Sequence, residues 1–221
     1  MYFSSFFSKQ AKKPTGLFGS IVMAAIFDIG NAYLNAMAED ALAIENKDHV
    51  IDIGCGTGKL IRNMANKINE GYIEGVDFSH SMVSIARKKN KKQINKGIVK
   101  IVEDDFDSLF YQNENFDKAC SVNTIYFWPK PEVTATKIFS ILKPGGRLIL
   151  AFEDIRQLQQ RNLDHDVFNF YTLEKVEDLL YRSGFSSVEI ISKTKGKLKF
   201  HCVVAIKHTK SDPPPLNWTR G

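Results

Sequence analysis

The stretch HVIDIGCGTG, residues His49–Gly58, decides the fold of this chain. An apolar run of strand-forming residues leads into three alternating glycines, after which a helix is expected. Glycine lacks a Cβ, so the backbone at Gly54, Gly56 and Gly58 can turn sharply and pass close to a ligand, and the free N–H groups that open the helix face that ligand. The stretch therefore predicts a strand, a ligand-binding turn and a helix in an α/β fold.

A carboxylate follows at the end of a second strand pattern. Residues 71–77 read GYIEGVD, and Asp77 ends this run about 20 residues after the glycine turn. An acid at that position can accept hydrogen bonds from both ribose hydroxyls of a nucleoside. Together the turn and the acid predict a nucleotide-type site at the carboxyl ends of two strands.

Size and composition indicate a single domain. The chain has 221 residues, of which 43% are hydrophobic, and this is enough for one α/β core. The three cysteines lie far apart without Cys-x-x-Cys spacing, so we expect no disulfide scaffold, no metal site and a cytoplasmic location. The apolar run Ile21–Phe27 is shorter than the roughly 20 residues of a membrane span, and no signal peptide is indicated. We expect no membrane partner.

Basic residues concentrate in one segment of a chain whose formal net charge is +5. A cluster of this kind is typical of a solvated helix end, where cations also suit the helix dipole. No aromatic residues interleave it to stack on bases, which disfavours nucleic acid as a partner without removing that alternative. The cluster comprises Arg87, Lys88, Lys89, Lys91, Lys92, Lys96 and Lys100.

Strand and helix patterns alternate through the middle of the chain. The alternation predicts a parallel sheet, and two final strand patterns joined by residues 193–197 predict an antiparallel hairpin. We expect strands at 49–53, 72–77, 98–102, 118–122, 147–152, 185–191 and 198–206, helices at 58–69, 80–95, 131–142 and 172–183, and a turn at 143–146.

The regions that flank this core have a different character. Apolar residues at helical spacing from Leu17 to Ile44 indicate one or two helices that cap the main fold. The run Pro213–Pro215 favours extended backbone. We therefore divide the chain into an N-terminal helical extension at 1–46, a core domain at 47–207 and a flexible Pro-rich tail at 208–221.

Four motifs then occur in a fixed order between about Val50 and Ile206. Residues 52–58 (DIGCGTG) resemble the first motif of the class I S-adenosylmethionine-dependent methyltransferases, and residues 77–79 (DFS) with Met82 resemble the second. Asp105–Phe106 with residues 115–117 (NFD), and residues 142–148 (LKPGGRL), are similar to later motifs of that family. The resemblance implies a Rossmann-like, doubly wound, seven-stranded sheet. This sheet is mostly parallel, carries helices on both faces, and inserts its last strand antiparallel beside the fifth.

The same resemblance implies S-adenosylmethionine as cofactor and assigns roles to individual residues. Asp77 would bind the ribose diol, and Asp105 would accept a hydrogen bond from the adenine amino group. The backbone carbonyl near Val122 and Asn123 would meet the cofactor's ammonium group. The implied cofactor-binding residues are Asp52, Gly54, Cys55, Gly56, Gly58, Asp77, Phe78, Met82, Asp105, Phe106 and Asn123.

Some of these assignments leave alternatives open. Asp77 and Asp105 can each be ordinary loop carboxylates, and Phe78, Met82 and Phe106 can be core residues. Asp104 adjoins Asp105 and makes the register ambiguous, although the spacing to Leu109 favours Asp105. Cys55 has no base near it in sequence, which argues against a nucleophile.

The residues that act on the acceptor are less defined. Tyr126 and Trp128 follow the fourth strand and can form an aromatic wall or simply cover the sheet edge. His165 stands between Asp164 and Asp166 after the fifth strand, where it can serve as a base or be a surface residue. We treat all three as candidate catalytic residues.

The acceptor class follows from the resemblance. Residues 123–126 (NTIY) lack the two prolines found in nucleic-acid amino methyltransferases, and the segment from Lys13 onward resembles the lid of small-molecule methyltransferases. We therefore expect a small-molecule acceptor. The oligomeric state is left open.

Three other functions compete with this interpretation. A nicotinamide-dependent oxidoreductase also uses a glycine turn and a ribose acid, but Lys59 stands where its last glycine belongs. A binding module without catalytic activity is opposed by the intact motifs. An RNA or protein methyltransferase that uses the basic cluster would bind its macromolecular substrate with an affinity that falls steeply as the salt concentration rises.

Overall fold

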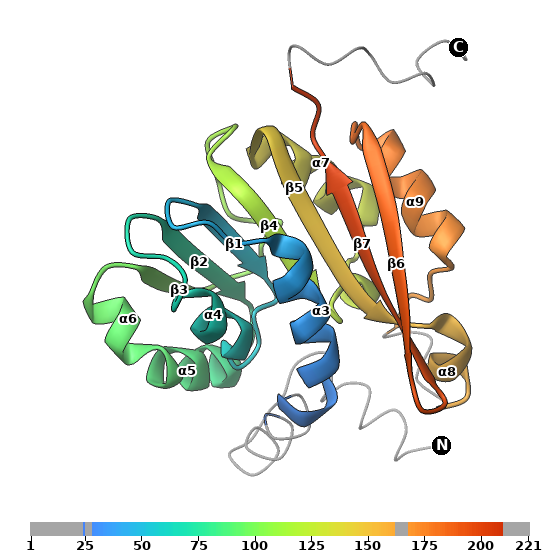
Figure 1. The fold of residues 1–221 in the computed structure, drawn as a ribbon, viewed down its shortest axis with the longest axis horizontal. Helices are drawn as coiled ribbons and strands as arrows, with labels where there is room; N and C mark the ends of the chain where they lie inside the picture. Colours follow the sequence, from blue (N-terminus) through green and yellow to red (C-terminus); the bar gives the residue numbers. More distant parts are fainter. Residues whose placement is uncertain (1–23, 25–27, 162–167, 210–221) are drawn as a thin grey trace.

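The computed structural model describes residues 24, 28–161 and 168–209. Seven strands form one twisted sheet in the order β3-β2-β1-β4-β5-β7-β6, which spans the molecule in Figure 1. Strand β7 is antiparallel to β5 and β6, and the other pairings are parallel. This confirms the predicted doubly wound sheet with its inserted last strand. The strands are β1 His49–Ile53, β2 Tyr72–Asp77, β3 Val99–Glu103, β4 Phe116–Val122, β5 Leu142–Glu153, β6 Ser187–Lys195 and β7 Leu198–Ile206.

Helices cover both faces of this sheet. Successive side chains of a strand point to opposite faces, so the inner strands bury apolar residues on both sides. In β1, Val50 packs in a cluster with α3, α4 and α5, whereas Ile51 packs in a second cluster with α7 and α9. The helices are α3 Ala32–Leu42, α4 Lys59–Met64, α5 His80–Lys89, α6 Lys91–Asn95, α7 Pro131–Ile141, α8 Ile155–Gln159 and α9 Leu173–Arg182, with a short 3₁₀ helix η1 at Ile125–Phe127.

Helix α3 belongs to the core layer. Its residues Leu34, Ala38 and Leu42 are fully buried, and the helix packs on β4, β5 and β7. Residues 1–23 and 25–27 of the predicted N-terminal extension lie outside the described residues. A lid role for the extension, and the division of the chain at residue 46, therefore stay predictions, as does the flexibility of the tail.

Several predicted elements differ from the structure. The helix expected at 58–69 ends at Met64, and β6 extends to Lys195 into the expected linker at 193–197. The single helix expected at 80–95 is interrupted at Asn90, whose buried side-chain amide donates to the carbonyls of Gly58, at 3.0 Å, and Ala86, at 2.9 Å. The turn expected at 143–146 lies inside β5. Gly145 donates to the carbonyl of Lys207, and the N–H of Lys207 donates back to Gly146, so the pairing with the end of β7 continues through these residues.

Candidate functional site

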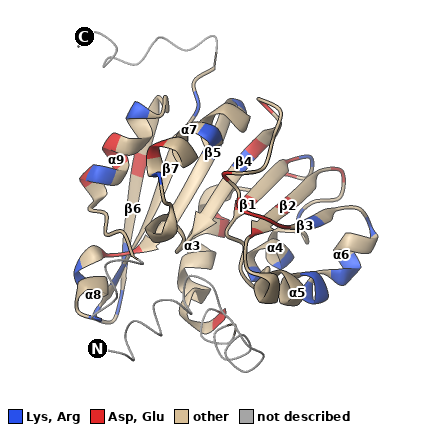
Figure 2. Cartoon of the chain, turned by 180° about the vertical axis from the view of Figure 1, so that it is seen from behind, with Lys and Arg blue, Asp and Glu red and all other residues tan. Residues whose placement is uncertain are grey.

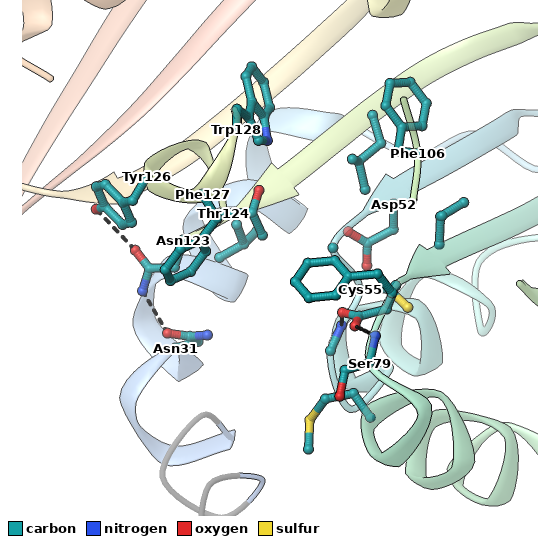
Figure 3. Close-up of a pocket in the computed structure, with 18 of the residues that line it drawn as sticks. Asn31, Asp52, Cys55, Ser79, Phe106, Asn123, Thr124, Tyr126, Phe127 and Trp128 are labelled. Atoms are coloured by element: carbon teal, nitrogen blue, oxygen red, sulfur yellow. Dashed lines mark hydrogen bonds between the residues drawn. The ribbon is translucent and has the colours of Figure 1, made fainter. Parts of the chain in front are cut away.

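A cavity of about 670 Å³ opens at the carboxyl ends of the central strands. It lies where the strand order reverses between β1 and β4, which is the place at which doubly wound sheets bind ligands. Its volume falls in the range of about 300 to 1,000 Å³ of small-molecule sites. Figure 3 shows Asp52, Cys55 and Ser79 on one side and Asn123, Tyr126 and Trp128 on the other.

The glycine turn forms one wall of the cavity. Gly54, Gly56 and Gly58 have φ angles of 73°, 52° and 68°, the left-handed region that favours glycine. A Cβ at Gly54 would overlap the side chain of Thr124. The N–H groups of Gly54 and Cys55 both donate to the carbonyl of Val76, at 2.8 and 3.0 Å. These bonds hold the turn against the end of β2.

Asp77 is fixed at the floor of the cavity by two backbone groups. Its Oδ2 accepts from the N–H of Gly56 at 2.9 Å, and its Oδ1 accepts from the N–H of Ser79 at 2.8 Å. Burial raises the pKa of this carboxyl, while the two N–H groups act in the opposite direction. Each oxygen keeps a lone pair for a further donor, which is what a ribose diol requires.

Asp52 and Cys55 lie deeper beside Asp77. Burial, together with the charge of Asp77, raises the pKa of Asp52 to about 7, although a hydrogen bond from the thiol of Cys120 opposes this. Burial also raises the pKa of the Cys55 thiol. Because a thiol and not a thiolate is then favoured, Cys55 is a poor nucleophile, in agreement with the sequence interpretation.

The residues predicted around the adenine all line the cavity. Phe78 is partly exposed, Met82 is fully buried, and Phe106 is buried beneath the ammonium group of Lys137, which lies 4.7 Å from the ring centroid. Asp104 and Asp105 both line this end. Oδ1 of Asp104 accepts two hydrogen bonds, and Oδ1 of Asp105 accepts one. Because both residues line the cavity, either acid is within reach of a ligand.

Asn123 connects the residue before α3 to the 3₁₀ helix η1. Its φ of 57° places it in the left-handed region, and its amide donates to Oδ1 of Asn31 at 2.7 Å. Its side-chain oxygen accepts from the hydroxyl of Tyr126 at 3.3 Å. The side chain therefore ties the start of α3 to η1.

Tyr126 and Trp128 are buried and line the cavity. The Tyr126 hydroxyl lies 3.2 Å from the carbonyl of Glu153 and accepts from the Glu153 N–H at 2.7 Å. Burial raises the pKa of this phenol well above its usual range. The ring of Tyr126 thus forms part of the cavity wall, and its hydroxyl connects η1 to β5. His165, the third candidate, lies outside the described residues.

The cavity also includes residues that sequence reasoning missed. Asn31, Phe127, Leu158, Arg161 and Phe168 line it. Each comes from a helix end or loop without a motif, and no spacing in the sequence connects them. Only the tertiary arrangement brings the start of α3, α8 and the segment after α8 to the same sheet edge.

Asp28 ties the segment before α3 to the glycine turn. Its carboxylate lies 2.7 Å from the ammonium group of Lys89 and accepts from the hydroxyl of Thr57, and its carbonyl accepts from Lys59 at 2.8 Å. Burial alone would raise the pKa of Asp28, but the bonds with Lys89 and Thr57 prevail and lower it. The ionised acid is therefore favoured in this contact.

A second buried contact holds α8 in place. Asp154 caps this helix by accepting from the N–H of Arg156 at 2.9 Å, and its Oδ2 lies 3.0 Å from Nε2 of His201. Burial would raise the pKa of Asp154, but these bonds prevail and lower it. Through Asp154, strand β7 positions the helix that carries Leu158 to the cavity.

Most of the predicted basic cluster lies on α5 and α6, as Figure 2 shows, whereas Lys96 follows α6 and Lys100 lies on β3. Some of its members make internal contacts. Arg87 donates to the carbonyl of Ile101, Lys89 pairs with Asp28, and Lys100 pairs with Glu74. Within residues 24, 28–161 and 168–209, no group of three His, Cys, Asp or Glu side chains is arranged to hold a metal ion. No helix in this part of the chain is long and apolar enough to cross a bilayer.

Fold and cavity together define a doubly wound α/β protein with a nucleoside-type site at its switch point. Residues 51–150 match the family model of a methyltransferase domain. The chain is 25% identical over 184 residues to 24-methylenesterol C-methyltransferase 2 of Arabidopsis thaliana, covering 83% of this chain and 50% of that protein. It is 36% identical over 106 residues to demethylmenaquinone methyltransferase of Leptospira interrogans, covering 46% of this chain and 41% of that protein.

Among solved structures, phosphoethanolamine N-methyltransferase 2 of Haemonchus contortus, in complex with phosphomonomethylethanolamine and S-adenosylhomocysteine, has the same fold. Its TM-score is 0.70 at 16% identity, over 84% of this chain and 57% of that chain. Residues 51–150 therefore form a methyltransferase domain with the fold of the class I S-adenosylmethionine-dependent methyltransferases, and S-adenosylmethionine is the cofactor that such a domain uses. The chain spans about half of the sterol relative and less of the menaquinone relative.

Proposed function

We propose that this chain transfers a methyl group from S-adenosylmethionine to a small-molecule acceptor. The observation that carries the proposal is one cavity with the glycine turn and Asp77 at one end and the rings of Tyr126 and Trp128 at the other. When bound, S-adenosylmethionine supplies a methyl carbon that its sulfonium makes electrophilic. Relatives that act on a sterol and a menaquinone precursor, by their names, support a small acceptor.

The glycine turn and Asp77 fit this cofactor. The carboxylate of Asp77 is held by the N–H groups of Gly56 and Ser79, and it accepts hydrogen bonds from the ribose hydroxyls. Phe78 and Met82 pack on the adenine, and Asp105 accepts from its amino group. The carbonyl at Asn123 accepts from the ammonium group of the methionine end. The proposed roles are supported by the position of these residues, all of which line the cavity.

On the acceptor side, the protein aligns groups and excludes water. Methyl transfer is an in-line displacement, so fixed geometry in a water-poor cavity supplies much of the rate. The hydroxyl of Tyr126, bonded to the backbone of Glu153, holds η1 against the end of β5 and keeps the aromatic wall in place. His165 is proposed as the base for an acceptor that must lose a proton.

Calorimetric titration tests the cofactor part, and a metabolite panel screened for formation of S-adenosylhomocysteine tests the acceptor part. We expect binding of both S-adenosylmethionine and S-adenosylhomocysteine, followed by turnover with at least one small molecule. No binding at millimolar cofactor would reject the proposal. Turnover of RNA alone, with affinity that falls steeply with salt and after Lys88, Lys91 and Lys92 are changed to Ala, would reject the small-molecule acceptor.

A further inference from the structure

The cavity has a second compartment beyond the cofactor end. Its described lining comes from η1 and the residue after it, from the end of β5, from α8 and from the residues that flank 162–167. The glycine turn and the segments after β2 and β3 line the opposite end. Figure 3 shows the labelled residues of η1 across the cavity from Asp52 and Phe106. We call this the acceptor compartment. It is formed by Tyr126, Phe127, Trp128, Glu153, Leu158, Arg161 and Phe168.

Most side chains that line the acceptor compartment are apolar. The rings of Phe127 and Phe168 lie 4.7 Å apart, and those of Tyr126 and Phe168 lie 6.0 Å apart, between centroids. Trp128 and Leu158 are buried beside them. Rings that pack on one another are held in place and present fixed apolar faces. A ligand here gains from apolar area removed from water.

The charges in this compartment are already compensated. Both oxygens of Glu153 are engaged, since Oε1 lies 3.1 Å from one guanidinium nitrogen of Arg161 and Oε2 lies 2.5 Å from another. Gln157 donates a further hydrogen bond to Oε2 at 3.1 Å. A bidentate carboxylate–guanidinium pair satisfies both partners. Neither side chain is left to neutralise a charged ligand.

The rest of the described lining disfavours an anion. Its basic side chains are Lys59 and Arg161. Arg161 pairs with Glu153, whereas Lys59 begins α4 beside the glycine turn, at the cofactor end, where it donates to the carbonyl of Asp28. The opposite end carries several acids, namely Asp52, Asp77, Asp104, Asp105 and Asp107. A phosphate or carboxylate in the acceptor compartment would find no uncompensated cation among the described residues of that compartment, and the acids of the opposite end would repel it across the cavity.

We propose that the methyl acceptor is a neutral, predominantly apolar molecule. The proposal rests on the proposed function and deepens it, because it selects one chemical class among small acceptors. An anionic phosphomonoester lacks a free basic partner among the described residues of the acceptor compartment. A permanent cation would find aromatic faces but no uncompensated carboxylate in the acceptor compartment.

Three probes that share a naphthalene ring test the charge preference by calorimetry. They are neutral N-phenyl-1-naphthylamine, its anionic sulfonate 8-anilino-1-naphthalenesulfonate, and the cation (1-naphthylmethyl)trimethylammonium. We expect the neutral probe to bind at least tenfold more tightly than either charged one. In a Trp218→Phe background, the remaining tryptophan, Trp128, should transfer excitation energy to it. Equal or tighter binding of a charged probe overturns the proposal.

Two variants locate the binding. Arg161→Gln uncovers Glu153, and since the Arg161 side chain is 44% exposed the fold should persist. The cationic probe should then gain at least fivefold, and no gain contradicts the argument. Leu158→Gln should weaken the neutral probe at least fivefold, whereas the matched change Leu198→Gln, at an exposed site on β7, should not. Equal losses in both would place the probe elsewhere.

S-adenosylhomocysteine, titrated into the same samples, separates this inference from the proposed function. If it binds while the charge preference fails, the acceptor class is wrong and the methyltransferase proposal stands. If it does not bind, the proposed function itself fails.

Discussion

Replacing Asp77 by Asn should weaken S-adenosylhomocysteine binding far more than it changes folding. The amide keeps the shape of the side chain but loses its charge and one acceptor oxygen. A hydrogen bond to a charged group contributes roughly 1.5 to 3 kcal/mol. One ribose bond lost and one weakened then amount to about 2 to 4 kcal/mol, or about 30-fold to 1,000-fold in Kd.

The same change has two opposing effects on stability. One of the N–H groups of Gly56 and Ser79 loses its acceptor, which costs about 1 to 3 kcal/mol when the group is buried. Burial of the ionised acid, the cause of its raised pKa, is relieved at the same time. The free energy of unfolding should therefore change less than the binding free energy.

Calorimetric titration of the wild type, Asp77→Asn and Glu103→Gln checks this prediction. Glu103 pairs with Asp77 in the sheet register but bonds to His80 outside the cavity, so it is a matched acid-to-amide control. We expect less than a twofold change in Kd for Glu103→Gln. A Kd for Asp77→Asn within threefold of the wild type, or an equal loss in the control, would refute the assignment of the ribose acid.

Three further predictions follow from contacts around the site. Asn90→Ala should lower the free energy of unfolding by about 1 to 3 kcal/mol, because two backbone carbonyls lose their donor; an unchanged urea midpoint would contradict this. Asp154 has a lowered pKa, so its contribution to stability is present above its unfolded pKa and is lost as pH falls through the folded value. In urea unfolding, the loss of free energy of unfolding caused by Asp154→Asn should thus become smaller toward acid pH. A loss that becomes larger toward acid pH would contradict this prediction. Asp28→Asn should speed dissociation of S-adenosylhomocysteine severalfold in stopped-flow measurements, and Lys89→Met should do the same, since either change breaks the contact between the segment before α3 and the glycine turn; unchanged rates in both would remove this role.

Strand positions and the cofactor end of the site could be predicted because their signals are local. Strands β1 and β2 are buried on both faces, and the sequence shows this as largely apolar runs. The glycine turn is also a local signal, because each of its three glycines by itself permits left-handed backbone. The break at Asn90 could not be predicted from the helical pattern. It depends on a hydrogen bond to Gly58, 32 residues earlier in the chain.

The acceptor compartment could be predicted only in part. The segment that contains Tyr126, Phe127 and Trp128 could be located because it follows β4, but nothing in the sequence shows which of its rings line the cavity. Leu158 and Phe168 carry no motif. The compensation of Glu153 by Arg161 joins residues eight positions apart. Nothing in their spacing distinguishes this pair from two solvated charges.

By itself, the sequence determined the class of fold, the turn at 54–58 and the acid at Asp77, because each depends on backbone freedom or on the period of a single strand. Only the tertiary structure decided which residues share the cavity, that Tyr126 is held as a buried phenol, and that the charges of the acceptor compartment cancel. The physical reason is that hydrogen bonds and burial depend on distances between segments, and these distances exist only once the sheet has brought the strand ends together.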